Sequence, residues 1–214
     1  MRTPSAAGSL IIGDRDLTSG DRAALLGLAR ATLTAHLARR PLPPAPAVPG
    51  VLLKRGAFVT IMARGALRGC IGHIAADRDL GAVVREMTVA AAQDDPRFPP
   101  VEPDELPDLA LEISVLSEAA PVVPPVDPGR IAVGRDGVIV RRGRHVGLLL
   151  PQVAREHHWG PDALLAATCR KAGLPPEAWR EPGTELFTFQ ADVFGETGET
   201  GETGKGKGET RFRG

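Results

Sequence analysis

The stretch Leu67-Arg68-Gly69-Cys70-Ile71-Gly72 places a cysteine between two glycines, inside a run that otherwise predicts a buried strand. Glycine weakens the interior of a strand, so two glycines around one thiol predict a bulge or the close approach of another backbone. Because side chains alternate along a pleated strand, we expect Arg68 and Gly72 to share a face with Cys70. The same alternation points His73 to the opposite face.

Two interpretations of Cys70 stay open. A guanidinium beside the thiol, supplied by Arg68, would favour the thiolate, which is the reactive form of cysteine. Cys70 would then be a nucleophile or a covalent carrier, with His73 or the distant His145 as its base. In the other interpretation Cys70 is a small buried apolar residue, as most free cysteines are.

The segments around this stretch predict an α+β fold. Residues 58–62 and 67–74 predict two strands joined at Arg64-Gly65. A helix that begins after Thr18 extends to about residue 39, and a second helix follows Asp79 and ends before Asp94. We therefore expect a mainly antiparallel sheet with helices packed on it, with room for a large and a small lobe.

Later segments extend the predicted sheet. Residues 109–116 alternate, so Glu112 is expected to face solvent or a cleft. Residues 131–133 and 138–140 flank an Asp-Gly pair, which favours a hairpin. Residues 186–194 alternate as well and predict a final strand.

The two ends of the chain differ from its middle. Residues 195–214 begin with three Gly-Glu-Thr repeats and continue with Gly204-Lys205-Gly206-Lys207-Gly208, which offers no apolar residue to bury, so a disordered tail is predicted. Residues 1–17 form an N-terminal extension whose apolar run, Leu10-Ile11-Ile12, is too short for a secretion signal. The folded domain is expected to span residues 18–194.

Composition excludes several classes of partner. The formal net charge is zero and the isoelectric point is about 7.0, so the chain lacks the positive charge that nucleic-acid binding requires. No apolar run approaches the length that crosses a membrane, so a membrane is not an expected partner either. Cys70 and Cys169 are far apart in the sequence and are expected to stay reduced, which favours a cytoplasmic location.

Neither a metal nor a cofactor is indicated. His157 and His158 are neighbours, and neighbouring helical side chains diverge by about 100°, so the pair is poorly placed to ligate one ion. The chain has no dinucleotide fingerprint and no paired Cys-x-x-Cys, so the sequence names no cofactor.

Asp95 and Arg97 bring a carboxylate and a guanidinium together around Pro96. The pair could order a substrate, or it could tie the loop to the sheet, because aspartates in turns commonly bond nearby backbone. Both interpretations stay open.

Several segments, taken in order, resemble the AMMECR domain family. The resemblance covers about residues 20 to 194 and is strongest at residues 67–72. The other matching segments are Gly56-Ala57-Phe58-Val59-Thr60, Asp95-Pro96-Arg97-Phe98, Glu112-Ile113-Ser114-Val115-Leu116, Leu149-Leu150-Pro151-Gln152-Val153 and Cys169-Arg170-Lys171-Ala172-Gly173-Leu174.

This resemblance implies a function. Bacterial and archaeal members are similar to protein A of the AmmeMemoRadiSam system, which implies a Memo-like protein and a radical SAM enzyme as partners. The implied role is component A of that system, an enzyme acting on an unknown small substrate at a cleft that contains Cys70. The residues expected there are Cys70, Arg68 and His73 as catalytic groups, and Gly69, Gly72, Asp95, Arg97 and Glu112 as substrate contacts. A non-enzymatic scaffold for these partners, and a carrier that holds an intermediate on the thiol, are the alternatives.

Overall fold

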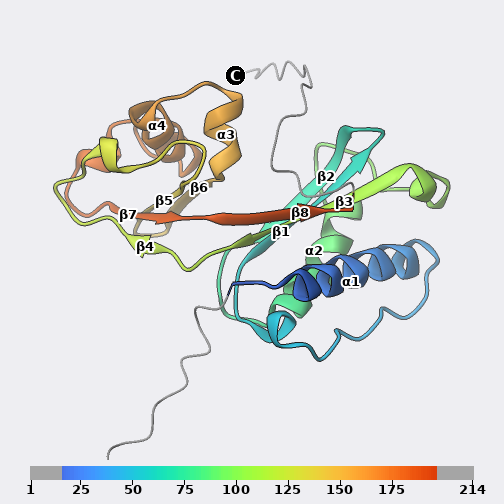
Figure 1. The fold of residues 1–214 in the computed structure, drawn as a ribbon. Helices are drawn as coiled ribbons and strands as arrows, with labels where there is room; N and C mark the ends of the chain where they lie inside the picture. Colours follow the sequence, from blue (N-terminus) through green and yellow to red (C-terminus); the bar gives the residue numbers. More distant parts are fainter. Residues whose placement is uncertain (1–15, 197–214) are drawn as a thin grey trace, which may run out of the picture.

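The computed structural model describes residues 16–196, which form a large and a small lobe (Figure 1). Each lobe is built on one four-stranded antiparallel sheet with helices packed against it. The α+β fold and the mainly antiparallel sheets expected from the sequence are thus confirmed.

The large lobe contains a sheet with the strand order β2-β1-β3-β8, and two long helices cover one of its faces (Figure 1). The opposite face of this sheet is called the open face below. Buried apolar side chains between the helices and the sheet form the main core. The elements of this lobe are α1 (Ser19–Leu37), the 3-10 turn η1 (Pro49–Leu52), β1 (Ala57–Ala63), β2 (Ala66–His73), α2 (Leu80–Gln93), the 3-10 helix η2 (Pro103–Asp108), β3 (Leu109–Leu116) and β8 (Ala191–Gly195).

The start of α1 is fixed by a capping box. The Thr18 hydroxyl accepts a hydrogen bond from the Asp21 backbone N–H, and the Asp21 carboxylate accepts one from the Thr18 backbone N–H. The second carboxylate oxygen of Asp21 accepts a 3.0 Å hydrogen bond from the backbone N–H of Gly50. One buried carboxylate therefore ties the first turn of α1 to η1.

The hairpin predicted at Arg64-Gly65 is present, and it contains a bulge. Arg64 and Gly65 both have positive φ, which gives the tight turn between β1 and β2. Met62 pairs with Leu67 but Ile61 pairs with Gly69, so Arg68 is the extra residue. The bulge interrupts the alternation of side chains immediately before Cys70.

The small lobe contains a second sheet with the order β4-β7-β5-β6. Two helices pack on it and bury a separate apolar core that includes Cys169 and Trp179. The elements of this lobe are β4 (Ala120–Pro121), the 3-10 turn η3 (Pro128–Arg130), β5 (Gly137–Arg142), β6 (His145–Leu149), α3 (Pro151–Glu156), α4 (Pro161–Lys171), the 3-10 turn η4 (Ala178–Arg180) and β7 (Glu185–Phe189).

The hairpin predicted around Asp136-Gly137 is wrong. Residues 131–133 form no strand, because the buried Asp136 carboxylate accepts a hydrogen bond from the Ala132 backbone N–H and closes a local turn. The true hairpin joins β5 to β6, where Arg142 pairs with His145 across a turn in which Gly143 has positive φ.

A two-stranded ribbon runs through both lobes (Figure 1). β3 pairs with β8 in the large lobe, and their continuations β4 and β7 pair in the small lobe. At the crossing point the backbone N–H of Ser117 donates to the Gln190 carbonyl, and the Gln190 N–H donates to the Ser117 hydroxyl. Leu116, Leu148 and Phe189 form a small buried apolar cluster that includes residues of both lobes.

The described chain begins and ends against the large lobe. Leu17 is buried in the main core, and β8 extends to Gly195, the first residue of the predicted tail. Glu196 accepts a hydrogen bond from the Leu111 backbone N–H. The rest of the predicted extension and tail, residues 1–15 and 197–214, lies outside the described residues. Within residues 16–196 no helix has the length and apolar character needed to span a membrane.

Candidate functional site

Cys70 lies in a row of three side chains that crosses the open face of the large sheet. Thr60 pairs with Cys70 on one side and with Glu112 on the other, so the three belong to neighbouring strands β2, β1 and β3. The Thr60 hydroxyl donates a 3.3 Å hydrogen bond to the Cys70 sulfur. Neighbouring strands are about 4.8 Å apart, which places the Cys70 and Glu112 backbones about 10 Å from each other.

Asp95 and Arg97 cover the outer edge of β2 at Cys70. The Asp95 carboxylate accepts a 2.8 Å hydrogen bond from the Cys70 backbone N–H, and the Arg97 guanidinium donates to the Cys70 carbonyl at 3.4 Å. The two side chains also bond each other at 2.7 Å. Together they form hydrogen bonds with the backbone N–H and carbonyl that an edge strand would otherwise present to solvent.

The two members of this pair differ sharply in exposure. The Asp95 side chain is 3% exposed and the Arg97 side chain 54%. Hydrogen bonds from Arg97, reinforced by those from backbone N–H groups, lower the pKa of Asp95 to about 2 despite its burial. The buried carboxylate thus holds an exposed guanidinium beside Cys70.

The surroundings of Cys70 favour its protonated form. Burial raises the pKa of Cys70, and the carboxylates of Asp95 and Glu112 act in the same direction. The hydrogen bond from Thr60 and the charge of Arg97 lower this pKa but do not reverse the shift. The local environment therefore stabilises the thiol rather than the thiolate.

Both glycines beside Cys70 sit where another group comes close, as the sequence suggested. A Cβ on Gly69 would lie 2.1 Å from the Ala91 carbonyl oxygen in α2, on the covered face of the sheet. A Cβ on Gly72 would lie 2.2 Å from the ring of Phe58, on the open face. The lack of a side chain at Gly69 therefore lets α2 pack closely on β2. At Gly72 it makes room for the ring of Phe58, which packs on the cluster between the lobes.

Arg68 does not lie where alternation predicted. The bulge makes it the extra residue of β2, and its guanidinium forms an ion pair with Glu105 at 2.8 Å. It also donates to the carbonyls of Pro99 and Pro100. No hydrogen bond or ion pair within residues 16–196 joins it to Cys70, and the guanidinium beside Cys70 is that of Arg97.

Neither histidine considered as a base contacts Cys70. His73 follows the opposite face, as expected, and its Nε2 lies 2.7 Å from an Asp77 carboxylate oxygen. His145 Nδ1 lies 3.2 Å from the Ala172 carbonyl, at the end of α4. Their proposed roles as bases stay predictions that no contact to the thiol supports.

Two residues related to Cys70 could not be assigned from the sequence: Thr60, which contacts the sulfur, and Lys171, whose charge interacts with Cys70. Although the Lys171 side chain is exposed, desolvation by the protein around it lowers its pKa, and the charges of Cys70 and Arg97 act on it in opposite directions. Its ammonium has no hydrogen bond or ion pair within the part of the chain that the structure describes. The small lobe therefore brings a cation into electrostatic range of Cys70.

A cavity of about 840 Å³, called the interlobe cleft below, begins at the Glu112 end of the row. Met62 and Glu112 line it from the large sheet, and Gln152 and Arg155 line it from α3. Arg135 completes this side and is held by an ion pair with the buried Asp136. Its volume lies within the usual range of small-molecule sites.

The structure brings together about half of the eight expected site residues, and Arg68 and His73 are not among them. Cys70, Asp95 and Arg97 are in contact, and Glu112 shares their row, whereas Gly69 belongs to the covered face. Within residues 16–196 no three histidine, cysteine, aspartate or glutamate side chains are grouped to hold a metal ion.

Comparison with known proteins relates this chain to one family. A family model described as AMMECR1 matches residues 26–194. A protein of Methanothermobacter thermautotrophicus is 49% identical over 148 residues, which cover 68% of this chain and 77% of the relative. A protein of Thermofilum pendens is 42% identical over 196 residues, 85% of this chain and 92% of the relative.

A crystal structure has the same fold. It is that of the uncharacterized protein PH0010 from Pyrococcus horikoshii, which superposes with a TM-score of 0.74 at 39% sequence identity. The match covers 83% of this chain and 92% of that one. Both lobes are therefore shared with a solved relative.

Proposed function

This chain belongs to the AMMECR1 family, and on that premise we propose that it is component A of a system with a Memo-like protein and a radical SAM enzyme. In this proposal it works in the cytoplasm and binds a small substrate that extends from the interlobe cleft along the row to Cys70, which does not itself line the cleft. The named partners rest on the family resemblance alone.

One observation carries the substrate-binding part of the proposal. The row of Cys70, Thr60 and Glu112 connects a thiol to the wall of a cavity of ligand size. At the other end of the row, Arg97 is fixed by a buried carboxylate, yet half of its side chain faces solvent. A preorganised cation beside a thiol favours a substrate with an anionic group.

Chemistry at Cys70 would require removal of the thiol proton, because the free site stabilises the thiol. Lys171 is a better candidate base than His73, since it lies within electrostatic range of Cys70 and its pKa is lowered. The nucleophile would be Cys70, and Arg97 would hold the anionic group of the substrate.

The raised pKa of Cys70 also favours a second candidate, the non-enzymatic protein-binding module. In that role the Cys70 thiol is only packing, and the cleft receives a segment of the Memo-like or radical SAM partner. The two candidates predict opposite results for Cys70→Ser. This variant would stop turnover by the assembled system if Cys70 reacts, and would leave turnover and partner binding unchanged if it only packs.

The pH dependence of Cys70 alkylation by iodoacetamide is the first test. In the Cys169→Ala background we expect complete alkylation with a midpoint above the ordinary thiol value of about 8.5, because burial disfavours the thiolate. Arg97→Gln is expected to raise the midpoint further by removing a positive charge, whereas Arg141→Gln, on an exposed arginine of β5, leaves it unchanged. Protection at every pH would contradict a reacting Cys70 and support the binding module.

A further inference from the structure

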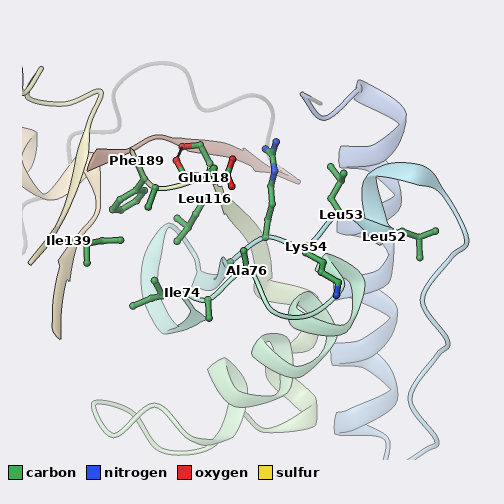
Figure 2. Close-up of a pocket in the computed structure, with 14 residues that line it drawn as sticks. Leu52, Leu53, Lys54, Ile74, Ala76, Leu116, Glu118, Ile139 and Phe189 are labelled. Carbon is green, nitrogen blue, oxygen red and sulfur yellow. Dashed lines mark hydrogen bonds between the residues drawn. The ribbon is translucent and has the colours of Figure 1, made fainter. Parts of the chain in front are cut away.

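A second cavity, called the junction groove here, lies between the two lobes and away from the Cys70 row. Its volume is about 690 Å³. Figure 2 shows Leu52 and Leu53 on one side of it and Ile74, Leu116 and Phe189 on the other. None of its lining residues takes part in the site described above.

Apolar side chains in this groove are left uncovered by the described chain. Leu52 is 54% exposed and Ile74 is 41% exposed, although both line the same cavity as Leu116 and Phe189. Solvent-facing leucine and isoleucine side chains that line one concavity are typical of a surface that another segment covers. The groove therefore lacks part of its apolar packing within residues 16–196.

The described chain begins close to this groove. Leu17 and Leu53 are buried in the same core cluster, and the Asp21 carboxylate near the start of α1 accepts a hydrogen bond from Gly50. Gly50 precedes Leu52 by two residues, a span of at most about 7 Å. A segment that leads into Leu17 thus starts within a short distance of the groove wall.

The sequence before Leu17 contains side chains of the right kind. Leu10, Ile11 and Ile12 form its apolar run, and the five steps from Ile12 to Leu17 can span about 17 Å when extended. Asp14 lies within this connection. Its carboxylate complements Lys54, a groove residue whose ammonium has no ion pair within residues 16–196.

We propose that Leu10, Ile11 and Ile12 of this chain occupy the junction groove and cover Leu52 and Ile74. The N-terminal extension then acts as a strap that packs against both lobes at their junction. This assignment is independent of the substrate and of any chemistry at Cys70.

Cysteine cross-linking tests the contact in the full-length chain. In the Cys70→Ser background, Ile11→Cys with Leu52→Cys should form an intramolecular disulfide under mild oxidation. Ile11→Cys with Val146→Cys should not, since Val146 is similarly exposed at 50% but lies on β6. A disulfide that joins two chains instead would make a second copy the occupant and overturn the proposal.

Hydrogen exchange provides a test without new cysteines. Ile11→Asp should expose the groove and speed exchange of the backbone amides at residues 52–56 and 74–76 by about tenfold or more, as a protected surface opens. Ala7→Asp adds the same charge outside the apolar run and should leave these rates unchanged. Equal rates in wild type and Ile11→Asp would show that the segment does not cover the groove.

Discussion

Replacing Gly69 with alanine is expected to destabilise the fold by about 3 kcal/mol, at the upper end of what overpacking costs. The added methyl carbon would lie 2.1 Å from the Ala91 carbonyl oxygen, and backbone cannot rotate out of the way as a side chain can. Either α2 moves away from β2 or the strand bends. Both movements disturb the loop after α2, which carries Asp95 and Arg97 to the edge of Cys70.

Urea unfolding of the full chain measures this loss, and Gly27→Ala is the matched control. Gly27 is an exposed residue in the middle of α1, and nothing lies within 4 Å of the methyl group it would gain. This substitution is expected to stabilise the protein by about 0.5–1 kcal/mol, the usual gain from glycine to alanine in a helix. A Gly69→Ala protein as stable as wild type would show that the strand and helix are not in close contact.

Replacing Asp95 with alanine is expected to cost about 3 kcal/mol, because it leaves the Cys70 backbone N–H without its acceptor and releases Arg97. Asp95→Asn keeps an oxygen for the Cys70 N–H and should lose about half as much. Asp94→Ala is the control, since Asp94 is exposed and its side chain is only 3.5 Å from that of Gln93. Its effect should stay within about 0.5 kcal/mol.

The contribution of Asp95 also depends on pH. Its pKa is about 2 in the folded protein, against about 3.9 in an unfolded chain, so the ionised form stabilises the fold by roughly 2 kcal/mol. This stabilisation is fully present above about pH 4 and is lost as the pH falls through about 2. The difference in unfolding free energy between wild type and Asp95→Asn should therefore shrink between pH 4 and pH 2.5, and a constant difference would contradict the ion pair.

Local signals in the sequence were sufficient for many of the elements. The capping residues at Thr18, the positive-φ turn at Arg64-Gly65 and the helix end before Asp94 all act within a few residues, so a sequence pattern predicts them. The hairpin predicted from the Asp-Gly pair at Asp136 was wrong, because an Asp-Gly pair occurs both in hairpin turns and in turns that the aspartate carboxylate closes. It closes a turn with the Ala132 N–H instead of a hairpin, and this choice depends on burial and on the ion pair with Arg135.

Several residues of the site could be predicted from the sequence, but which of them lie next to one another could not. The turn at Arg64-Gly65 without a bulge would place Thr60 opposite Gly69, and only the extra residue Arg68 moves it opposite Cys70. The extra residue forms an ion pair with Glu105, which is far along the chain, and no local pattern indicates this contact. Lys171 is about a hundred positions from Cys70 in sequence, so no local pattern could place it there.

The ribbon of β3, β4, β7 and β8 has a consequence for how the chain can fold during synthesis. Strands β1, β2 and β3 of the large lobe precede the small lobe in the chain, but the fourth strand, β8, is translated only after the small lobe. Contacts between segments so distant in sequence form slowly, because a long loop must close first. The large sheet is therefore incomplete, with β3 still an open edge, until β8 is available. The two lobes are separate in space, yet the large lobe can complete its fold only after the small lobe has been synthesised.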